Sequence, residues 1–229
     1  MERLALSQGG RTASLILKCI VMIVAFIGAL ITVSANGSGF MGRPKMFLLF
    51  TGMSVMLTVL ISAVGAVLLL GNKAVKNGWF VFKYVGTVAI TVTGAVFAVL
   101  LVPMGTNQVW NVQNVLTHAV VPIAAVADFF VVGRCGELKM KHALLTPLPF
   151  LAYAVFSYIA YTAGLTFPSG KRYPYFFLNW GSPAGAFGFS AQSPYMGCVW
   201  WVLAGSLAVL CVGLLYVLII RRMKRGKPA

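Results

Sequence analysis

Six long apolar runs dominate this sequence and constrain its fold more than any other feature. They span residues 13–35, 46–70, 79–103, 113–133, 145–166 and 196–220. A helix needs about 20 predominantly apolar residues to cross the hydrocarbon core of a bilayer, and each run reaches that length. The sequence therefore predicts an all-α polytopic membrane bundle of six transmembrane helices, with residues 1–229 forming a single integral membrane domain.

Charged residues are scarce and almost all of one sign. They make up 9% of the chain, whereas a soluble domain carries about 25%, so a water-soluble fold is excluded. The net charge of +15 is typical of nucleic-acid-binding proteins, but here the basic residues form short clusters between apolar runs. We therefore expect membrane lipids as partners and no nucleic acid.

The positions of the basic residues predict the orientation of the helices. If the N-terminus is inside, most of the 18 Lys and Arg residues fall on inner segments, and the outer segments hold only Arg43, Lys45, Lys171 and Arg172. Lys and Arg are enriched in cytoplasmic loops. This distribution predicts that both termini are cytoplasmic, with residues 221–229 as a basic tail.

The few acids and cysteines restrict the chemistry. The acids are Glu2, Asp128 and Glu137, one terminal, one within an apolar run and one in a basic loop. A paired-carboxylate site, such as glycosidases use, is therefore excluded. The four cysteines show no CxxC spacing, so we expect neither a metal site nor a disulfide framework, and no organic cofactor is indicated.

Two polar residues near the outer ends of their helices can be combined into a catalytic pair. Thr51 lies near the start of the second run and His118 near the start of the fourth, at similar expected depths. A hydroxyl beside a neutral imidazole is the minimum for a nucleophile with its base. Hydroxyl residues also pack between membrane helices without any catalytic role. That interpretation applies to Thr51 as well, and His118 can simply bond a neighbouring helix.

Asp128 is the only acid inside a predicted span. It follows His118 by ten residues, which is about 15 Å along a helix, too far to orient the imidazole. Lys83, near the inner end of the third run, is its possible partner. The residue can form a structural ion pair, fix helix packing as a protonated carboxyl, or take part in a proton relay.

The loop after the fifth run, about residues 167–195, is rich in aromatic residues, Gly and Pro. Trp and Tyr favour the membrane–water interface, so we expect this loop to cap the bundle at the outer leaflet. It contains the segment Tyr173-Pro174-Tyr175-Phe176-Phe177-Leu178-Asn179.

Three segments together resemble the androgen-inducible-protein-like family of membrane proteins and its bacterial six-helix relatives. The first is Phe50-Thr51 followed by Ser54, and the second is Thr117-His118 followed by Val121-Pro122 and Asp128. The third is the loop segment just given, which is close to Tyr-Pro-Tyr-Pro-Phe-Leu-Asp. The sequence departs from that motif at Phe176, where the family has proline, and at Asn179, where it has the acid.

The resemblance implies a location in a bacterial inner (plasma) membrane, and it also implies a function. Eukaryotic members of this family are threonine hydrolases of fatty acid esters of hydroxy fatty acids. The resemblance therefore implies a lipid ester substrate, with Thr51 as nucleophile and His118 as base. Supporting or substrate-binding roles are expected for residues near this pair and in the loop: Asn111, Asn114, Asp128, Tyr173, Tyr175 and Asn179.

Two non-enzymatic interpretations stay open at this point. In one, the protein is a small transporter or binding protein whose polar path runs through Asp128, Lys83 and His118. In the other, it is a structural protein without a site. The distance between Thr51 and His118 separates the hydrolase from both, because a nucleophile and its base must lie within hydrogen-bond reach.

Overall fold

The computed structural model describes residues 2–3, 6–34, 44–101 and 110–225. Almost all of them are helical. The α-helices are α1 (Gln8–Ser34), α2 (Phe50–Leu70), α3 (Asn77–Val96), α4 (Val112–Val115), α5 (Val121–Val132), α6 (Leu148–Thr162) and α7 (Cys198–Arg225). Residues 226–229 of the predicted basic tail and residues 102–103 of the third apolar run lie outside the described residues.

Two of the membrane-crossing segments contain a π-helical turn. The turn η2 (Phe97–Leu101) continues α3, and η4 (Leu116–Val120) joins α4 to α5. Short 3-10 turns precede two other helices, η1 (Pro44–Leu48) before α2 and η6 (Met140–Leu145) before α6. The second apolar run therefore begins as a 3-10 turn, and its α-helix starts at Phe50 instead of Met46.

Within the described residues, six helical segments are long and apolar enough to cross a membrane. This confirms the predicted fold class. The segments are Gln8–Ser34, Phe50–Leu70, Asn77–Val99, Val112–Val132, Met140–Thr162 and Cys198–Arg225. Their outward faces carry exposed Phe, Ile and Leu side chains, for example Phe26, Leu60 and Leu207, each more than 60% exposed. Such a surface suits contact with lipid tails.

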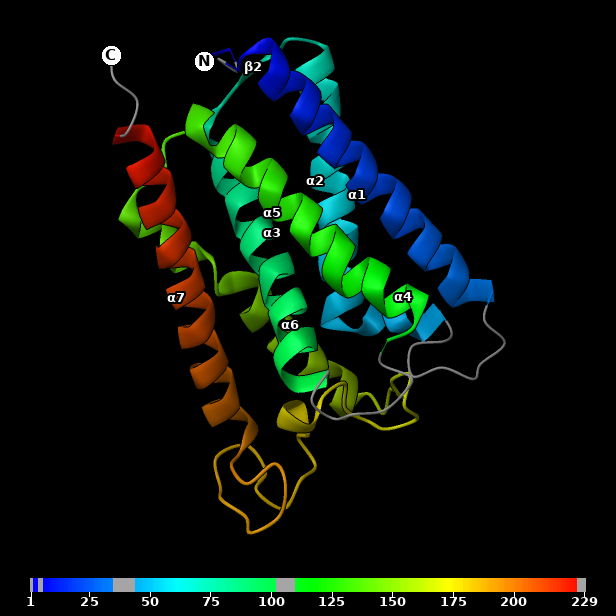
Figure 1. Cartoon of the computed structure of the whole chain (residues 1–229). Helices are drawn as coiled ribbons and strands as arrows, with labels where there is room; N and C mark the ends of the chain where they lie inside the picture. Colours follow the sequence, from blue (N-terminus) through cyan, green and yellow to red (C-terminus); the bar gives the residue numbers. More distant parts are fainter. Residues whose placement is uncertain (1, 4–5, 35–43, 102–109, 226–229) are drawn as a thin grey trace.

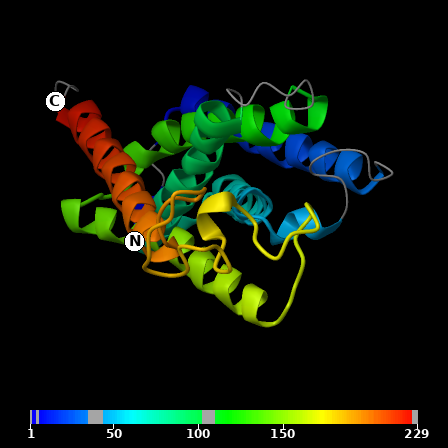
Figure 2. The same cartoon turned by 90° about the horizontal axis from the view of Figure 1, so that it is seen from below.

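The helices form a four-helix core with two flanking helices (Figures 1 and 2). In the core, α1 packs on α2 and α5, and α3 packs on the same two helices. Helices α6 and α7 contact α3 from its other side. Aromatic rings fill the junction between α3, α5 and α7, where Phe129 stacks on Tyr216 with their ring centroids 5.6 Å apart.

The two ends of the bundle differ in structure. The first residues of α1 and the last residues of α7 lie at one end (Figure 1), which we call the terminal end. There β1 (Glu2–Arg3) pairs antiparallel with β2 (Ala74–Val75). The segment 163–197 lies at the opposite end, which we call the loop end. This segment contains the short turn η7 (Phe176–Leu178), and it packs Tyr175 and Leu178 against α2 and α6. The aromatic loop therefore covers the loop end, and its location at the outer leaflet stays a prediction.

Candidate functional site

Thr51 is the second residue of α2 and lies half-buried at the loop end. Its carbonyl oxygen accepts a hydrogen bond from Ser54 Oγ at 2.9 Å. Thr51 belongs to the face of α2 that points into the bundle, because the buried residues Ser54 and Thr58 follow it at helical spacing. This position leaves its hydroxyl at the first turn of the helix, where backbone N–H groups have no intrahelical acceptor.

The Tyr175 hydroxyl lies against this first turn of α2. The Thr51 side chain and the backbone of Phe50 and Thr51 neighbour this hydroxyl and act to lower its pKa. Tyr175 is half-buried as a residue, but its hydroxyl end is enclosed, and this burial raises the pKa of the phenol above its ordinary value. The phenol therefore stays protonated at neutral pH and can donate a hydrogen bond.

Tyr153 of α6 supports Tyr175 from the side. The two rings lie 6.1 Å apart between centroids, and their hydroxyl groups interact. The Tyr153 hydroxyl also donates a hydrogen bond to the Leu48 carbonyl at 3.1 Å. Residues from η1, α2, α6 and the loop thus meet around the Tyr153 and Tyr175 hydroxyls.

His118 is buried in the π-helical turn η4. Its Nδ1 lies 2.9 Å from Thr117 Oγ1 and 3.2 Å from the Asn114 carbonyl oxygen. Thr117 Oγ1 donates its own proton to the Gln113 carbonyl at 2.9 Å, so both neighbours of Nδ1 act as acceptors. Nδ1 must therefore carry the hydrogen, and in the neutral ring Nε2 is the proton acceptor.

An aromatic stack holds the His118 ring. The imidazole lies on Phe97 of η2, with centroids 4.7 Å apart and planes inclined by 28°. The backbone can approach this closely because Gly94 faces η4, and a Cβ at Gly94 would lie only 3.1 Å from the His118 carbonyl oxygen. Phe97 and His118 both belong to π-helical turns, which occur frequently at functional sites.

One hydrogen bond fixes the register between α2 and α3. Ser54 Oγ and Thr93 Oγ1 lie 2.8 Å apart. The two helices run antiparallel, so the turn before Ser54 on α2 faces the turn after Thr93 on α3. Thr51 and Phe97 therefore lie in the same layer of the bundle, and His118 is stacked on Phe97. Among the described residues, no hydrogen bond joins Thr51 directly to His118.

Two apolar cavities flank the start of α2. One has a volume of about 240 Å³ and lies between α2, α3 and α6, with Phe50, Tyr153 and Phe156 in its wall. The other has a volume of about 260 Å³ and lies between α1, α2 and η1, with Gly52 and Thr117 in its wall. The residues on either side of Thr51 in the sequence, Phe50 and Gly52, each line one of these cavities, whereas Thr51 itself lines neither.

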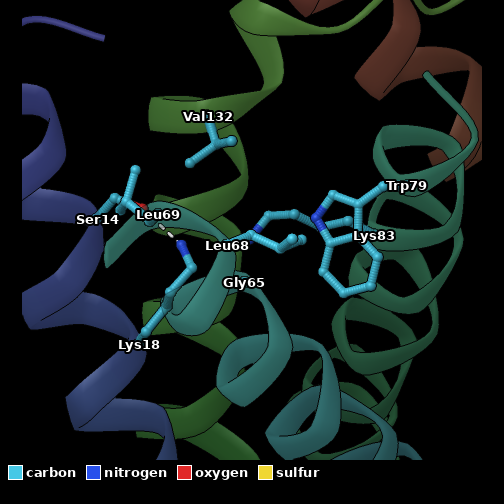
Figure 3. A pocket seen from close by; sticks show the side chains of 8 residues that line it. All are labelled: Ser14, Lys18, Gly65, Leu68, Leu69, Trp79, Lys83 and Val132. Carbon is cyan, nitrogen blue, oxygen red and sulfur yellow. Dashed lines mark hydrogen bonds between the residues drawn. The ribbon is translucent and has the colours of Figure 1, made fainter. Parts of the chain in front are cut away.

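A second polar cluster lies near the terminal end, four α-helical turns or more from Thr51 along α2. Asp128 of α5 accepts hydrogen bonds from Lys18 Nζ of α1 through both carboxylate oxygens, at 2.7 and 2.8 Å. It also accepts one from Ser14 Oγ at 2.6 Å. Lys83 of α3 contacts Asp128 Oδ2. Figure 3 shows the lysines entering from α1 and α3. The expected Lys83–Asp128 pairing is confirmed, and the sequence interpretation missed Lys18 as the second partner.

The remaining predicted supporting residues have structural contacts of their own. Asn111 caps α4, because its side chain accepts a hydrogen bond from the Asn114 amide at 2.8 Å. Asn114 is buried and offers its carbonyl to His118. Tyr173 lies under the Lys171 ammonium group, 5.4 Å from the ring centroid. Asn179 ends η7 and accepts a backbone hydrogen bond from Ser182 at 3.0 Å.

Sequence reasoning missed two residues of the loop-end site, Tyr153 and Phe97. Both are aromatic residues within apolar runs, where they read as ordinary packing residues. The available signal was positional: Phe97 falls one helical turn after Thr93, a hydroxyl residue of the third run at an expected depth similar to that of Ser54 in the second. No family model matches this chain, and neither curated proteins nor solved structures give a match. The fold and the site together describe a six-helix membrane bundle with a layer of hydroxyl and imidazole groups at the loop end.

Proposed function

We propose that this protein is a membrane-embedded hydrolase of lipid esters, of the fatty acid ester of hydroxy fatty acid type, with Thr51 as nucleophile and His118 as base. The observation that carries the proposal is the surroundings of the Thr51 hydroxyl. It neighbours the protonated Tyr175 phenol, and the residues on either side of Thr51 in the sequence, Phe50 and Gly52, line two apolar cavities. The three segments that resemble the androgen-inducible-protein-like family contribute Thr51, His118 and Tyr175, the same residues.

The two cavities fit a substrate with two hydrocarbon arms. An ester of a hydroxy fatty acid has an acyl chain on one side of its ester group and the hydroxy acid chain on the other. Cavities of about 240 and 260 Å³, lined by Phe50 and Gly52 respectively, can take the segments next to the ester. The ester carbonyl then lies at the first turn of α2, and the substrate enters sideways from the outer leaflet.

The chemistry follows from the donors and acceptors present. His118 Nε2 removes the proton from Thr51 Oγ1 as this oxygen attacks the ester carbonyl. The Tyr175 hydroxyl, polarised by the amides of α2, donates to the oxygen that becomes negatively charged. The hydroxy fatty acid leaves with the proton from the imidazolium, and an acyl-threonine ester remains. Water, deprotonated by the same imidazole, then releases the fatty acid and restores Thr51.

In the proposed mechanism, His118 comes within hydrogen-bond reach of Thr51 when the substrate binds. Catalytic hydrogen bonds are often long in ligand-free enzymes and tighten when substrate binds. Both residues belong to the Phe97 layer, and Phe97 and His118 are in π-helical turns. A rotation within η4 that brings His118 Nε2 to Thr51 Oγ1 is the motion that the mechanism requires.

The transporter interpretation has one contact in its favour, the pairing of Lys83 with Asp128. Its path also needs His118, whose ring instead contacts Phe97, Thr117 and Asn114 at the other end of the bundle. Within the described part of the chain, no hydrogen bond links His118 to the Asp128 cluster. We therefore favour hydrolysis.

The test is hydrolysis of a panel of lipid esters by the purified protein in detergent micelles or nanodiscs. We expect turnover of esters of hydroxy fatty acids, with a loss of at least about 10³-fold in kcat for Thr51→Ala. The matched control is Thr58→Ala, which removes a buried hydroxyl bonded only to the Ser54 carbonyl of its own helix and should keep the wild-type rate. Wild-type protein without turnover of any ester, or full activity of Thr51→Ala, would overturn the proposal.

A further inference from the structure

The polar cluster near the terminal end holds more positive than negative charge. The ammonium groups of Lys18 and Lys83 share one carboxylate, Asp128, and the two lysine side chains are only 3% and 6% exposed. Among the described residues, no other carboxylate contacts either lysine. The cluster therefore carries a formal charge of +1, and an uncompensated charge in a low-dielectric interior is costly.

Lys83 has N–H donors for which the described residues offer no acceptor. A lysine ammonium group has three N–H donors. Those of Lys18 are directed at Ser14 Oγ, at 2.5 Å, and at both oxygens of Asp128. Lys83 donates to Asp128 Oδ2, and its other two N–H groups have no acceptor among the described residues.

A small cavity adjoins these donors. Its volume is about 10 Å³, room for one water-sized particle, and its wall includes Ser14, Lys18, Trp79 and Lys83. Figure 3 shows Ser14 and Lys18 on one side and Trp79 and Lys83 on the other. Gly65 keeps this space open, because a Cβ there would lie 2.8 Å from Lys18 Cε. The Trp79 indole N–H makes no hydrogen bond to a described residue, so it can also serve as a donor.

The approach to the cavity is basic as well. Leu69 is part of the cavity wall, and the Arg11 guanidinium donates a hydrogen bond to its carbonyl at 2.7 Å. Lys73 and Lys76 lie exposed in the turn between α2 and α3. Positive potential at the mouth of a site raises the local concentration of anions.

We infer that the cavity beside Lys83 binds a single small monovalent anion, of which chloride is the physiological example. The anion cancels the excess charge of the Lys18–Asp128–Lys83 cluster and accepts hydrogen bonds from Lys83. A water molecule fits the same volume but leaves the charge uncompensated. Phosphate and carboxylate groups exceed the available volume. Binding to the folded state then ties α1, α3 and α5 together near the terminal end.

The experiment measures thermal unfolding of the purified protein in an uncharged detergent, at constant ionic strength, in sodium chloride or sodium gluconate. An anion that binds only the folded state raises the unfolding midpoint by mass action, by about 3–6 °C at ten times its dissociation constant. Lys83→Met leaves a neutral Lys18–Asp128 pair and should unfold at the same temperature in both salts. Lys141→Met, which removes an exposed charge outside the cavity wall, should keep the full chloride effect.

Bromide gives a second measurement on the wild-type protein that does not depend on Lys83→Met folding. It quenches indole fluorescence on contact, so bromide in the cavity should produce a saturable quenching that chloride competes away and that Trp79→Phe abolishes. Equal unfolding midpoints in chloride and gluconate for the wild type, together with quenching that rises only linearly with bromide, would overturn the inference. A chloride effect of the same size in Lys83→Met would do so as well.

Discussion

The two polar regions of this bundle accommodate buried polar groups in different ways. At the terminal end, charged groups are enclosed and directed at one another, with Asp128 receiving Lys18, Lys83 and Ser14. At the loop end, the polar groups are neutral hydroxyls, an imidazole and helix-terminal amides, and they border cavities of about 240 and 260 Å³. Neutral groups cost much less to leave partly unpaired inside a membrane protein than charged groups do.

Under the proposed function, this difference separates the sites of stability and of chemistry. The charge cluster joins α1, α3 and α5 through Asp128 and its two lysines. The neutral hydroxyl–imidazole layer has open space nearby, which the proposed substrate would occupy. We therefore expect substitutions at the terminal end to change folding and substitutions at the loop end to change turnover.

The largest effect on stability is expected for Asp128→Asn. This variant leaves two buried lysines without their carboxylate, and breaking a buried ion pair on one side costs roughly 3–5 kcal/mol. The variant should lose most of its folded fraction after detergent extraction, measured by size-exclusion chromatography and thermal unfolding. Glu137→Gln is the matched control, because this acid is exposed and pairs with Lys139 at 3.4 Å. An Asp128→Asn protein as stable as wild type would remove the distinction between the two ends.

The next effect is on turnover and belongs to Tyr175→Phe. The variant keeps the ring that stacks on Phe177, 5.2 Å away between centroids, and removes only the hydroxyl. Loss of one donor to a developing oxyanion costs about 10²–10³-fold in kcat, so we expect a decrease of that size with unchanged KM. Tyr158→Phe, at an exposed position of α6, should be fully active. Equal activity of both variants would limit Tyr175 to a packing role.

A smaller effect on stability is expected for Gly65→Ala. The added Cβ would lie 2.8 Å from Lys18 Cε, and Lys18 cannot move away without losing Asp128. Overpacking of this kind costs about 1–3 kcal/mol, and ester turnover should stay normal. Gly78→Ala is the control, because nothing lies within 4 Å of a Cβ there. A stable Gly65→Ala variant would show that the lysine is not held rigidly.

The smallest effect concerns alkaline pH. Burial raises the pKa of Tyr175 in the folded protein, so the neutral phenol stabilises the fold below the unfolded value of about 10. That contribution is lost as the pH rises above this value. The unfolding midpoint of the wild type should therefore fall relative to that of Tyr175→Phe as the pH rises from about 9 to about 11. A difference between the two proteins that does not change with pH would contradict an enclosed hydroxyl.

The sequence predicted the helices better than the contacts between them. Bilayer thickness sets the length of an apolar run, so all six crossing segments could be located. Depth alone indicated Lys83 as a partner for Asp128. Lys18 was missed because its contact depends on how α1 is rotated against α5, which no local pattern encodes. The interaction of Tyr175 with Thr51 depends on the path of the loop, and the 3-10 turn at Pro44–Leu48 moved the start of α2 to Phe50.

The central claim is that Thr51 is the nucleophile, and the most direct test is to locate a covalent adduct. A fluorophosphonate probe phosphonylates an activated hydroxyl, and mass spectrometry of the digested protein identifies the modified residue. We expect the adduct on Thr51 in the wild type and at least about 10²-fold slower labelling in His118→Gln, which removes the base. An adduct on another residue, or labelling of Thr51 at the wild-type rate in His118→Gln, would contradict the proposed pair.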